Sequence, residues 1–523
     1  MGKRLRWYLI IAAVVAVGVY GWKHRFGVPE EFIDSEAEYK YGSIGADHPM
    51  AMAPIPYWIF KVLPDVLPPS AVMQKDYAPR NGKKGYAAFG LVTEDEEEFA
   101  RPDGYGQGQT VFYRPIGVSK RTVLGIDFAG FNCAICHLTT LRTTPDAKPQ
   151  IILGGTGNTI NIEELFLYMF GAIGSDRFTA DAVMNAVAKE AAKQNKALGL
   201  FERLVYRYVA IPLMPRVLKA RQARYFDFIT IGSPTRLSDF GPGRVDTWAV
   251  YRRLYGDPPD NKPIQGTVDF PPIWNGRARP AGMQMHWDGN TDVFEERNVI
   301  SALAIIGKNI EYLDFPRLTR IAEFSNGMLP PRYEDRAPAN PASGPSIDPD
   351  LAERGATLFK AHCAGCHAPD GLRLGRVEPI ADLGTDGERL RDFTPELVNG
   401  INSLTTDAWK LRKFKLQKGY VNNLLDGIWL RAPYLHNGSV PTLRDLLNKP
   451  ESRPKKYCRG SDVYDWEKVG FVAKVVEFND KALCGEFFFF DTTATGNSNA
   501  GHLYGTKLKE KDKAALLEFL KTL

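Results

Sequence analysis

The sequence contains few of the residues that usually build metal and redox sites. Among 523 residues there are 6 cysteines and 8 histidines, so their positions carry most of the chemical information. The net charge is only +5, too small to indicate a nucleic-acid partner. Hydrophobic residues make up 44% of the chain and charged residues 24%, which excludes a disordered chain and a multispan transporter. At roughly 150 residues per domain, the length predicts two or three domains.

Long hydrophobic runs are also scarce, and the one that stands out lies at the N-terminus. Segment 7–22 follows a short basic stretch and carries Trp or Tyr at both ends, which is typical of a helix that enters a bilayer. No small-x-small cleavage site follows it. We therefore expect residues 1–29 to form an uncleaved signal anchor, a single transmembrane helix; a cleaved signal peptide is the alternative.

Four of the six cysteines lie in two copies of one motif, C-x-x-C-H, which is the attachment signature of c-type haem. In such a motif two thiols bind one haem covalently and the histidine is the proximal iron ligand. A zinc ribbon would place its cysteine pairs about 15–20 residues apart, and here they are far apart. The sequence predicts two covalently bound haem c groups. Their residues are Cys133, Cys136 and His137 in the first copy and Cys363, Cys366 and His367 in the second.

The remaining cysteines are Cys458 and Cys484. Because c-type haem is assembled where disulfides persist, we expect these two to form a disulfide that closes an insertion. Two unpaired buried thiols are the alternative. The same compartment argument places the haem-bearing body on the oxidising side of the membrane.

Composition along the chain favours a mainly α fold, with two cytochrome c-like haem domains, long loops and the N-terminal membrane anchor helix. We place the boundary between the haem domains in a proline-rich segment near residue 340. The expected parts are the anchor (1–29), an extension rich in Pro, Gly, Tyr and acidic residues (30–115), the first haem c domain (116–335) and the second cytochrome c-like domain (346–523).

Local signals give the outline of both haem domains. In the first domain, residues 179–228 show helical spacing of apolar residues. In the second, Asp348 is placed to cap a helix that starts at Pro349 and leads into Cys363. Segment 510–523 has a leucine stripe and is expected to be a final helix packed across the first one.

Methionine is absent where a cytochrome c domain normally has its distal ligand. No methionine follows Met328, so the second haem needs another sixth ligand. We favour His502, which lies in a Gly/Asn-rich loop before the last helix; His436 is the alternative. Two histidine ligands give a lower reduction potential than a His/Met pair.

Histidine is absent over a long stretch after the first motif. The next one after His137 is His286. We therefore expect the first haem to have an open or weakly ligated iron, which is able to bind oxygen species. Met169, Met184 or a tyrosine remain as ligands that would close it.

Two longer motifs accompany the haem motifs. One is segment 269–290, which contains Trp274 and the run His286-Trp287-Asp-Gly; the other is segment 427–443, which contains Arg431-Ala-Pro-Tyr. Together with the haem motifs they resemble the bacterial dihaem cytochrome c peroxidase superfamily, closest to its dihaem oxidoreductase and rubber oxygenase-like branch, over residues 115–523.

This resemblance implies roles for the two haems. The N-terminal haem would be the reactive one, the C-terminal haem would handle electrons, and Trp287 would relay electrons between them. For Trp274 we expect a structural role in the core.

The chain departs from the peroxidases in residues that matter for chemistry. The region of their catalytic Glu is occupied by 304–308, so Glu295 and Glu296 are the nearest carboxylates for the acid–base role that peroxide cleavage needs. Arg431 replaces a threonine that binds calcium, which argues against an interhaem calcium ion. Ala302 and Leu303 occupy the region of the distal Phe of the rubber oxygenases, so polyisoprene cleavage does not follow.

The sequence and the resemblance together predict a membrane-anchored dihaem c-type cytochrome oxidoreductase. It would span the bacterial inner membrane once, with its haem domains in the periplasm. Electrons would come from a soluble cytochrome or a quinol-linked carrier and reach peroxide or O2 at the N-terminal haem. A pure electron-transfer dihaem cytochrome with both irons closed is the alternative. No nucleic-acid partner is expected.

Overall fold

The computed structural model describes residues 27–32, 34–73, 83–94, 112–256, 264–307, 310–337, 346–404, 411 and 413–523. The apolar run of the expected signal anchor lies outside these ranges. Within them, no helix combines the length and the apolar character that a membrane crossing needs.

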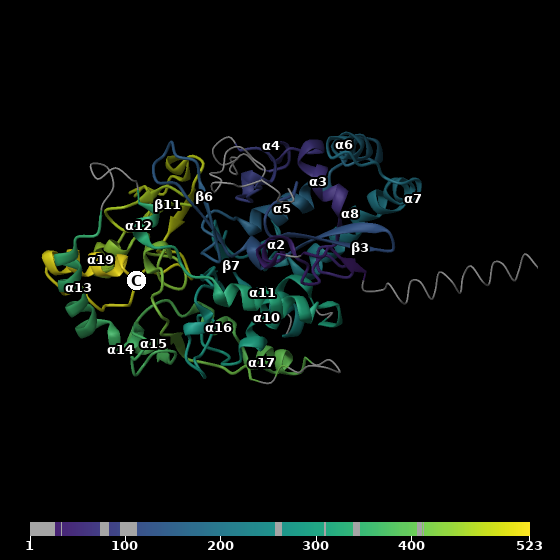
Figure 1. Cartoon of the computed structure of the whole chain (residues 1–523). Helices are drawn as coiled ribbons and strands as arrows, with labels where there is room; N and C mark the ends of the chain where they lie inside the picture. Colours follow the sequence, from purple (N-terminus) through teal and green to yellow (C-terminus); the bar gives the residue numbers. More distant parts are fainter. Residues whose placement is uncertain are drawn as a thin grey trace, which may run out of the picture.

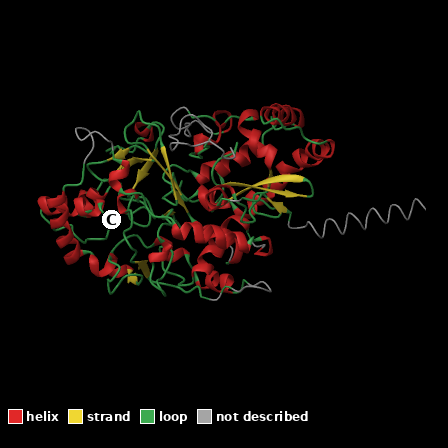
Figure 2. Ribbon diagram, in the orientation of Figure 1, coloured by secondary structure: helices red, strands yellow, loops and turns green. Residues whose placement is uncertain are grey.

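The described chain is mainly helical, with short strands between the helices (Figure 2). This agrees with the expected mainly α fold. The α-helices are α2 (Ser35–Tyr41), α3 (Tyr57–Val66), α4 (Pro69–Val72), α5 (Ile162–Ile173), α6 (Ala180–Lys193), α7 (Leu200–Val205), α8 (Ile211–Tyr225), α9 (Thr247–Tyr255), α10 (Phe294–Ile306), α11 (Phe315–Gly327), α12 (Tyr333–Arg336), α13 (Pro349–His362), α14 (Ala364–His367), α15 (Ile380–Leu383), α16 (Glu388–Asp392), α17 (Pro395–Asn402), α18 (Leu443–Leu446) and α19 (Glu510–Lys521). Within the range of the predicted helical segment 179–228 lie α6, α7 and α8.

The first motif follows directly on a four-stranded antiparallel sheet with the order β1-β3-β4-β2. Its strands are β1 (Val28–Pro29), β2 (Ile55–Pro56), β3 (Val118–Val123) and β4 (Ile126–Phe131). Strands β3 and β4 form a hairpin whose two turn residues, Leu124 and Gly125, both have positive φ, as a tight two-residue hairpin turn requires. Strand β4 then leads into the short 3-10 helix Cys133–Ile135, which carries the first motif.

The other strands pair two by two: β5 (Leu138–Leu141) with β6 (Gln150–Leu153), β7 (Arg244–Val245) with β8 (Val268–Asp269), β9 (Val377–Pro379) with β10 (Gly419–Val421), β11 (Lys456–Arg459) with β14 (Phe488–Asp491), and β12 (Tyr464–Asp465) with β13 (Gly470–Phe471). These short pairs fix loops rather than form a sheet core.

The second motif lies between two helices that cross closely. Asp348 caps α13 as predicted, because its carboxylate accepts hydrogen bonds from the amides of Asp350 and Leu351. Helices α13 and α19 contact one another over much of their length (Figure 1). A Cβ on Gly355 would lie 2.0 Å from the carbonyl oxygen of Ala515, so only glycine permits this crossing. The expected frame of a small helix entering the motif with the last helix packed across it is confirmed.

The hydrophobic core is shared between the two halves of the chain. One cluster joins Tyr39 and Leu303 to Leu397, and another joins Trp274 to Trp429. The N-terminal extension also contributes directly, since β2 extends the sheet beside the first motif. The bounds of the four expected parts remain predictions, but the described residues of the extension and of the two haem domains are packed into one body in Figure 1.

Cys458 and Cys484 form the predicted disulfide. Their Cα atoms lie 5.3 Å apart, and the two residues are 26 apart in sequence. The bond ties β11 to the segment that leads into β14. It therefore closes the loop that separates the second motif from the last helix, and the alternative of two unpaired thiols is excluded.

Candidate functional site

The first motif is held by a buried asparagine at the end of the sheet. Asn132 accepts a hydrogen bond from the amide of Ala134 (2.9 Å) and donates to the carbonyl oxygens of Tyr39 and Gly42. This bonding fixes the turn that presents the cysteines. Burial raises the pKa of the Cys133 thiol to about 11, so the pair lacks the thiolate character of a redox dithiol.

Both motif histidines have the same hydrogen bond on the back of the ring. The Nδ1 of His137 lies 2.8 Å from the carbonyl oxygen of Pro271, and the Nδ1 of His367 lies 2.7 Å from that of Asn423. A carbonyl at this distance fixes the tautomer in which Nδ1 carries the proton, and it leaves Nε2 as a metal ligand. Burial lowers the pKa of His137 to about 4, which keeps the imidazole neutral, as ligation requires.

His502 faces His367 at the second motif. The two ring centres lie 6.5 Å apart. Two metal–imidazole bonds of ~2 Å plus the distance from each nitrogen to its ring centre add up to about 6 Å, so the spacing suits two axial ligands of one metal. His502 has a left-handed backbone with φ +48°, and its Nδ1 is buried without a hydrogen-bond partner within the described ranges. This placement supports the predicted ligand.

The alternative ligand, His436, is engaged elsewhere. Its Nε2 lies 3.0 Å from the hydroxyl of Tyr420, and the two rings are stacked. Its carbonyl oxygen accepts a hydrogen bond from the amide of Asp269. His436 does not border the cavity described below, so it links the two halves of the chain rather than facing the second motif.

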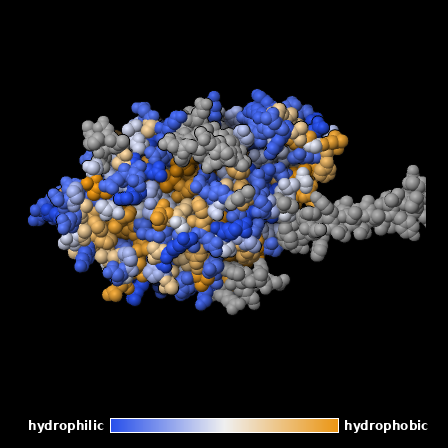
Figure 3. All heavy atoms as spheres, in the orientation of Figure 1, coloured by the Kyte–Doolittle hydropathy of each residue, from blue (hydrophilic) through white to orange (hydrophobic). Residues whose placement is uncertain are grey.

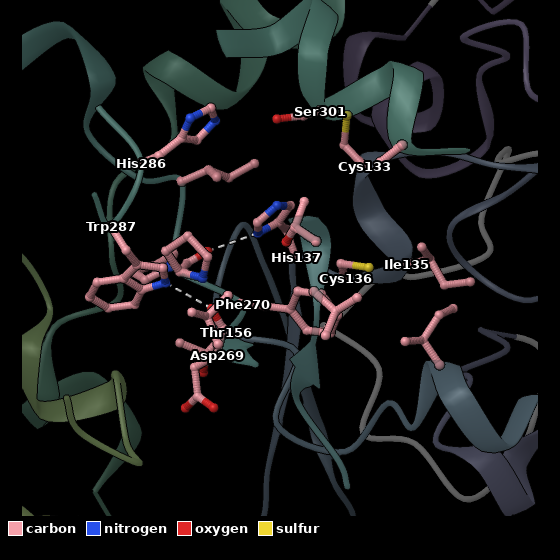
Figure 4. A pocket seen from close by; sticks show the side chains of 18 of the residues that line it. Cys133, Ile135, Cys136, His137, Thr156, Asp269, Phe270, His286, Trp287 and Ser301 are labelled. Atoms are coloured by element: carbon pink, nitrogen blue, oxygen red, sulfur yellow. Dashed lines mark hydrogen bonds between the residues drawn. The ribbon is translucent and has the colours of Figure 1, made fainter. Parts of the chain in front are cut away.

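Both motifs border one cavity of about 520 Å³. Cys133, Cys136 and His137 line it at one end, and Cys363, His367 and His502 line it at the other. Trp287 also borders this cavity (Figure 4). Its Nε1 donates to the carbonyl oxygen of Asp269 (2.9 Å), and its own carbonyl oxygen accepts from the amide of Val421. The indole is thus bonded to the first half of the chain, and the backbone of Trp287 is bonded to the second half.

Trp274 behaves as a core residue, as expected. It is 1% exposed, its Nε1 donates to the carbonyl oxygen of Leu153, and it does not line the cavity.

The space next to His137 is bordered by polar side chains from α10 and from the loop before it. His286 and Ser301 frame this space next to Cys133 (Figure 4). The Nδ1 of His286 lies 2.8 Å from Oδ1 of Asn290, which fixes Nε2 as the free basic nitrogen. Arg297, one helical turn before Ser301, lines the same cavity. These residues are able to hold and move protons beside a bound oxygen species.

Glu295 and Glu296 do not lie beside the cavity. Glu295 faces solvent, and Glu296 is buried with its carboxylate accepting the amide hydrogen of Lys413 (3.0 Å). Neither lines the cavity. The phase of α10 is the physical reason, since it turns Arg297, Asn298 and Ser301 toward the cavity and the two glutamates away from it. This placement argues against the predicted acid–base role.

Sequence reasoning missed one of the acidic residues that line the cavity. Glu163, on α5, borders it and accepts a hydrogen bond from the amide of Phe240 (2.7 Å). Burial and the nearby Asp239 raise the pKa of Glu163 to about 8. Nothing in the local sequence marks it, because it reaches the cavity only through the packing of α5.

Within the described ranges, no histidine ring is in contact with the ring of His137. The aromatic ring beside it is that of Phe270. Met169 and Met184, the predicted methionine alternatives, do not line the cavity, whereas Met52 and Met285 do. Tyr251 lines it as well, but its hydroxyl donates to the carbonyl oxygen of Ile300.

Buried arginines also border the cavity. Arg389 has an Nε and an Nη1 that are buried without a hydrogen-bond partner in the described chain, while its Nη2 lies 3.4 Å from Asp288. Arg279, Arg297 and Arg431 line the cavity too. Unsatisfied buried guanidinium nitrogens fit a group that carries carboxylates, as haem does.

Two other arginines of the chain, Arg244 and Arg277, do not line the cavity. Arg244 bonds Asn497 instead, and Arg277 lies beside Gly327. The paired thiols, the oriented histidines and the buried arginines together fit haem c. We find no group of three or more metal-binding side chains in the described ranges.

Two family models match the C-terminal half. A cytochrome c model matches residues 352–418, and a RoxA-like, cytochrome c-like model matches residues 419–458. They meet where β10 begins, at Gly419, and cover the second motif together with the Arg-Ala-Pro-Tyr segment.

Two curated relatives come from Sinorhizobium fredii (strain NBRC 101917 / NGR234). The uncharacterized protein y4iM is 30% identical over 310 residues, which is 50% of this chain and 66% of the relative. The uncharacterized protein y4iJ is 32% identical over 262 residues, which is 38% of this chain and 42% of the relative. The chain thus spans only part of the length of these relatives. With the geometry above, these likenesses identify the chain as a haem-containing cytochrome, related to RoxA-like proteins, with a cytochrome c domain at its C-terminal end.

Proposed function

We propose that the chain is a dihaem oxidoreductase with one covalently bound haem c at each motif. Electrons enter at the second motif, pass Trp287 and reach an oxygen species, peroxide or O2, at the first motif. The observation that carries this proposal is the asymmetry of the two sites. His367 has a second histidine at ligand distance, whereas no second histidine ring lies that close to His137 within the described ranges.

This asymmetry gives the two sites different tasks. An iron with two strong axial ligands exchanges electrons, and an iron with a free position binds and activates an oxygen species. The second site supports the first task, because His367 and His502 face one another at ligand distance. The residues around the first site support the second task.

Trp287 suits an electron relay by its position. It borders the cavity that both motifs share, its indole Nε1 donates to the carbonyl oxygen of Asp269, and its backbone carbonyl accepts from the amide of Val421. A rigid aromatic ring between two redox centres shortens the gap that an electron crosses. Trp274, which is packed in the core, serves as the matched tryptophan outside this position.

His286 suits the acid–base role that Glu295 and Glu296 do not fill. With Nδ1 bonded to Asn290, its Nε2 accepts the proton that hydrogen peroxide loses and returns it to the oxygen that leaves as water. The reduction of one hydrogen peroxide to two waters consumes two electrons and two protons. The carrier delivers one electron at a time, so two carrier molecules are oxidised for each peroxide. Arg297 adds positive charge on the same side, which favours the anionic form of the peroxide.

The surroundings of the protein are part of the proposal. Covalent haem and the disulfide both suit the periplasm. The apolar N-terminal run suits a single span of the bacterial inner membrane. The electron donor is then a soluble cytochrome or a quinol-linked carrier, as the sequence predicts.

A stopped-flow experiment tests the proposed function. The fully reduced holoprotein is mixed with hydrogen peroxide or with O2, and the absorbance of each haem is followed. Oxidation of both haems at a rate that depends on the oxidant concentration is expected. His286→Gln is expected to slow the peroxide step by about 10²-fold without altering either haem spectrum. His436→Gln, a buried histidine outside the cavity, is the control.

A reduced protein that reacts with neither oxidant would overturn the catalytic proposal. It would instead favour a pure electron-transfer cytochrome, in which Met52 or Met285 closes the first iron.

A further inference from the structure

An exposed apolar surface covers one continuous helical segment at the edge of the molecule. Helix α7, a π-helical turn (Tyr206–Ala210) and helix α8 follow one another without a break over residues 200–225. We call the apolar side chains that they expose the apolar helix patch. These are Leu200 (68% exposed), Phe201 (63%), Leu204 (47%), Tyr208 (67%), Val209 (53%) and Leu213 (49%).

The fold does not need these side chains outside. The same segment already anchors itself by burying Tyr206, Ile211, Met214 and Leu218. Leu200, Leu204 and Tyr208 recur at a spacing of four residues, so they lie along one strip of the helix. Soluble proteins seldom leave such a contiguous apolar strip exposed unless something covers it. Orange spheres mark this strip at the position of α7 in Figure 3.

The charge of the segment indicates what covers it. Residues 200–225 contain one acidic side chain, Glu202, and a set of basic ones: Arg203, Arg207, Arg216, Lys219, Arg221 and Arg224. A basic amphipathic helix with exposed leucine and aromatic side chains is typical of segments that lie in the interface of an anionic bilayer. A second copy of this chain would carry the same positive charge and would be repelled.

The patch also lies beside the N-terminal entry of the described chain. Phe201 contacts the β3–β4 turn, where a Cβ on Gly125 would lie 3.9 Å from its ring. In the same turn Leu124 is 51% exposed and extends the patch. Strand β3 pairs with β1, with Thr122 opposite Val28. The apolar run 7–22 ends shortly before β1 in the sequence, so only a short stretch of chain connects the run to the strand beside the patch.

We propose that the apolar helix patch, with Leu124, docks on the surface of an anionic bilayer. This inference rests on the membrane attachment included in the proposed function. Docking would hold the molecule at two points and fix its orientation. Helices α13, α14 and α19, which frame the second motif, lie at the opposite end of the molecule from α7 (Figure 1). The second motif would then face away from the bilayer, where a soluble carrier reaches it.

Lipid quenching of a single label tests the docking. The full-length holoprotein carries a fluorophore on Leu204→Cys and is reconstituted into phosphatidylglycerol-containing vesicles with brominated acyl chains. The control carries the same label on Leu372→Cys, which is 85% exposed and lies beyond the second motif. We expect quenching of the label at residue 204 and none at residue 372. Adding Leu200→Ser and Tyr208→Ser is expected to lower the quenching roughly twofold or more, while the protein still sediments with the vesicles.

The possible outcomes separate the two proposals. Protein that sediments with vesicles but shows equal quenching at both positions would overturn the docking and leave the attachment standing. Protein that does not sediment would overturn the attachment and the docking together. A label response that grows with protein concentration in detergent without vesicles would assign the patch to a second copy and would overturn the bilayer proposal.

Discussion

Replacement of His502 by alanine probes the ligation of the second site most sharply. The ring centres of His502 and His367 lie 6.5 Å apart, and two imidazole–metal bonds of ~2 Å with their ring radii account for about 6 Å. One iron therefore fits between the rings with only a small adjustment. Removing one imidazole opens a position for which the segment after the second motif offers no methionine, because none follows Met328.

The expected result is a change of spin state at one haem only. In His502→Ala the ferric second haem should turn from low spin to high spin, and the reduced protein should bind carbon monoxide at both haems. His502→Met should instead stay low spin and raise the midpoint potential of the second haem, because a thioether ligand favours the ferrous form. Each tenfold change in the oxidised-to-reduced equilibrium corresponds to about 59 mV.

Electron paramagnetic resonance and a redox titration followed by visible absorbance give these values. The control is His436→Gln, because His436 is the alternative that the sequence left open and its Nε2 is held by Tyr420. It should leave both spectra unchanged. An unaltered low-spin signal in His502→Ala would refute the ligand assignment, and a loss of that signal in His436→Gln would transfer the role to His436.

Further predictions concern the relay, the disulfide and a buried acid. Trp287→Phe should slow electron transfer between the haems without shifting either potential, whereas Trp274→Phe should leave the transfer rate unchanged; flash reduction of one haem followed by absorbance at both measures this rate. Replacing Cys458 and Cys484 by serine should lower the free energy of unfolding by about 3–4 kcal/mol for a loop of 26 residues, which denaturant titration measures; an unchanged midpoint would show that the closed loop contributes nothing. The pKa of Glu163 is raised to about 8, so the folded protein binds this proton more tightly than the unfolded chain. Its stabilising contribution is fully present below the ordinary carboxyl pKa and is lost as the pH rises through about 8. Scanning calorimetry should therefore show a melting temperature that falls between the ordinary carboxyl pKa and about pH 8 in the wild type and falls less in Glu163→Gln.

Short-range signals predicted the frame of the molecule correctly. The helix cap at Asp348, the final helix and the partnership of Cys458 with Cys484 depend on neighbouring residues or on a small set of candidates. The prediction of His502 as the sixth ligand depended on the small number of candidates. A domain without methionine after its haem motif has few other side chains that are able to bind the iron. In each of these cases the chain leaves few alternatives open.

Glu295 and Glu296 lie away from the cavity for a rotational reason. Successive residues of an α-helix point about 100° apart, so a helix known only by its sequence has an unknown phase relative to a cavity. In α10 that phase directs Arg297 and Ser301 toward the cavity, and it leaves Glu295 in solvent and Glu296 against the backbone of Lys413. Proximity along the chain to the predicted relay was not enough.

Other cavity residues were invisible to the sequence because tertiary packing brings them in. Arg389 reaches the cavity from α16 and meets Asp288, about a hundred positions earlier in the chain. Glu163 arrives on α5. Neither residue belongs to a motif. Arg389 stands out only because the fold buries two of its nitrogens without a hydrogen-bond partner in the described chain, and Glu163 only because the fold raises its pKa.

Carbon monoxide binding to the dithionite-reduced holoprotein tests the central claim most directly. The claim is that the second iron has two histidine ligands and that the first iron has an open position. The visible spectrum should therefore show a Soret shift that corresponds to one haem in two. No shift would mean two closed irons and would contradict the claim in favour of a pure electron-transfer cytochrome.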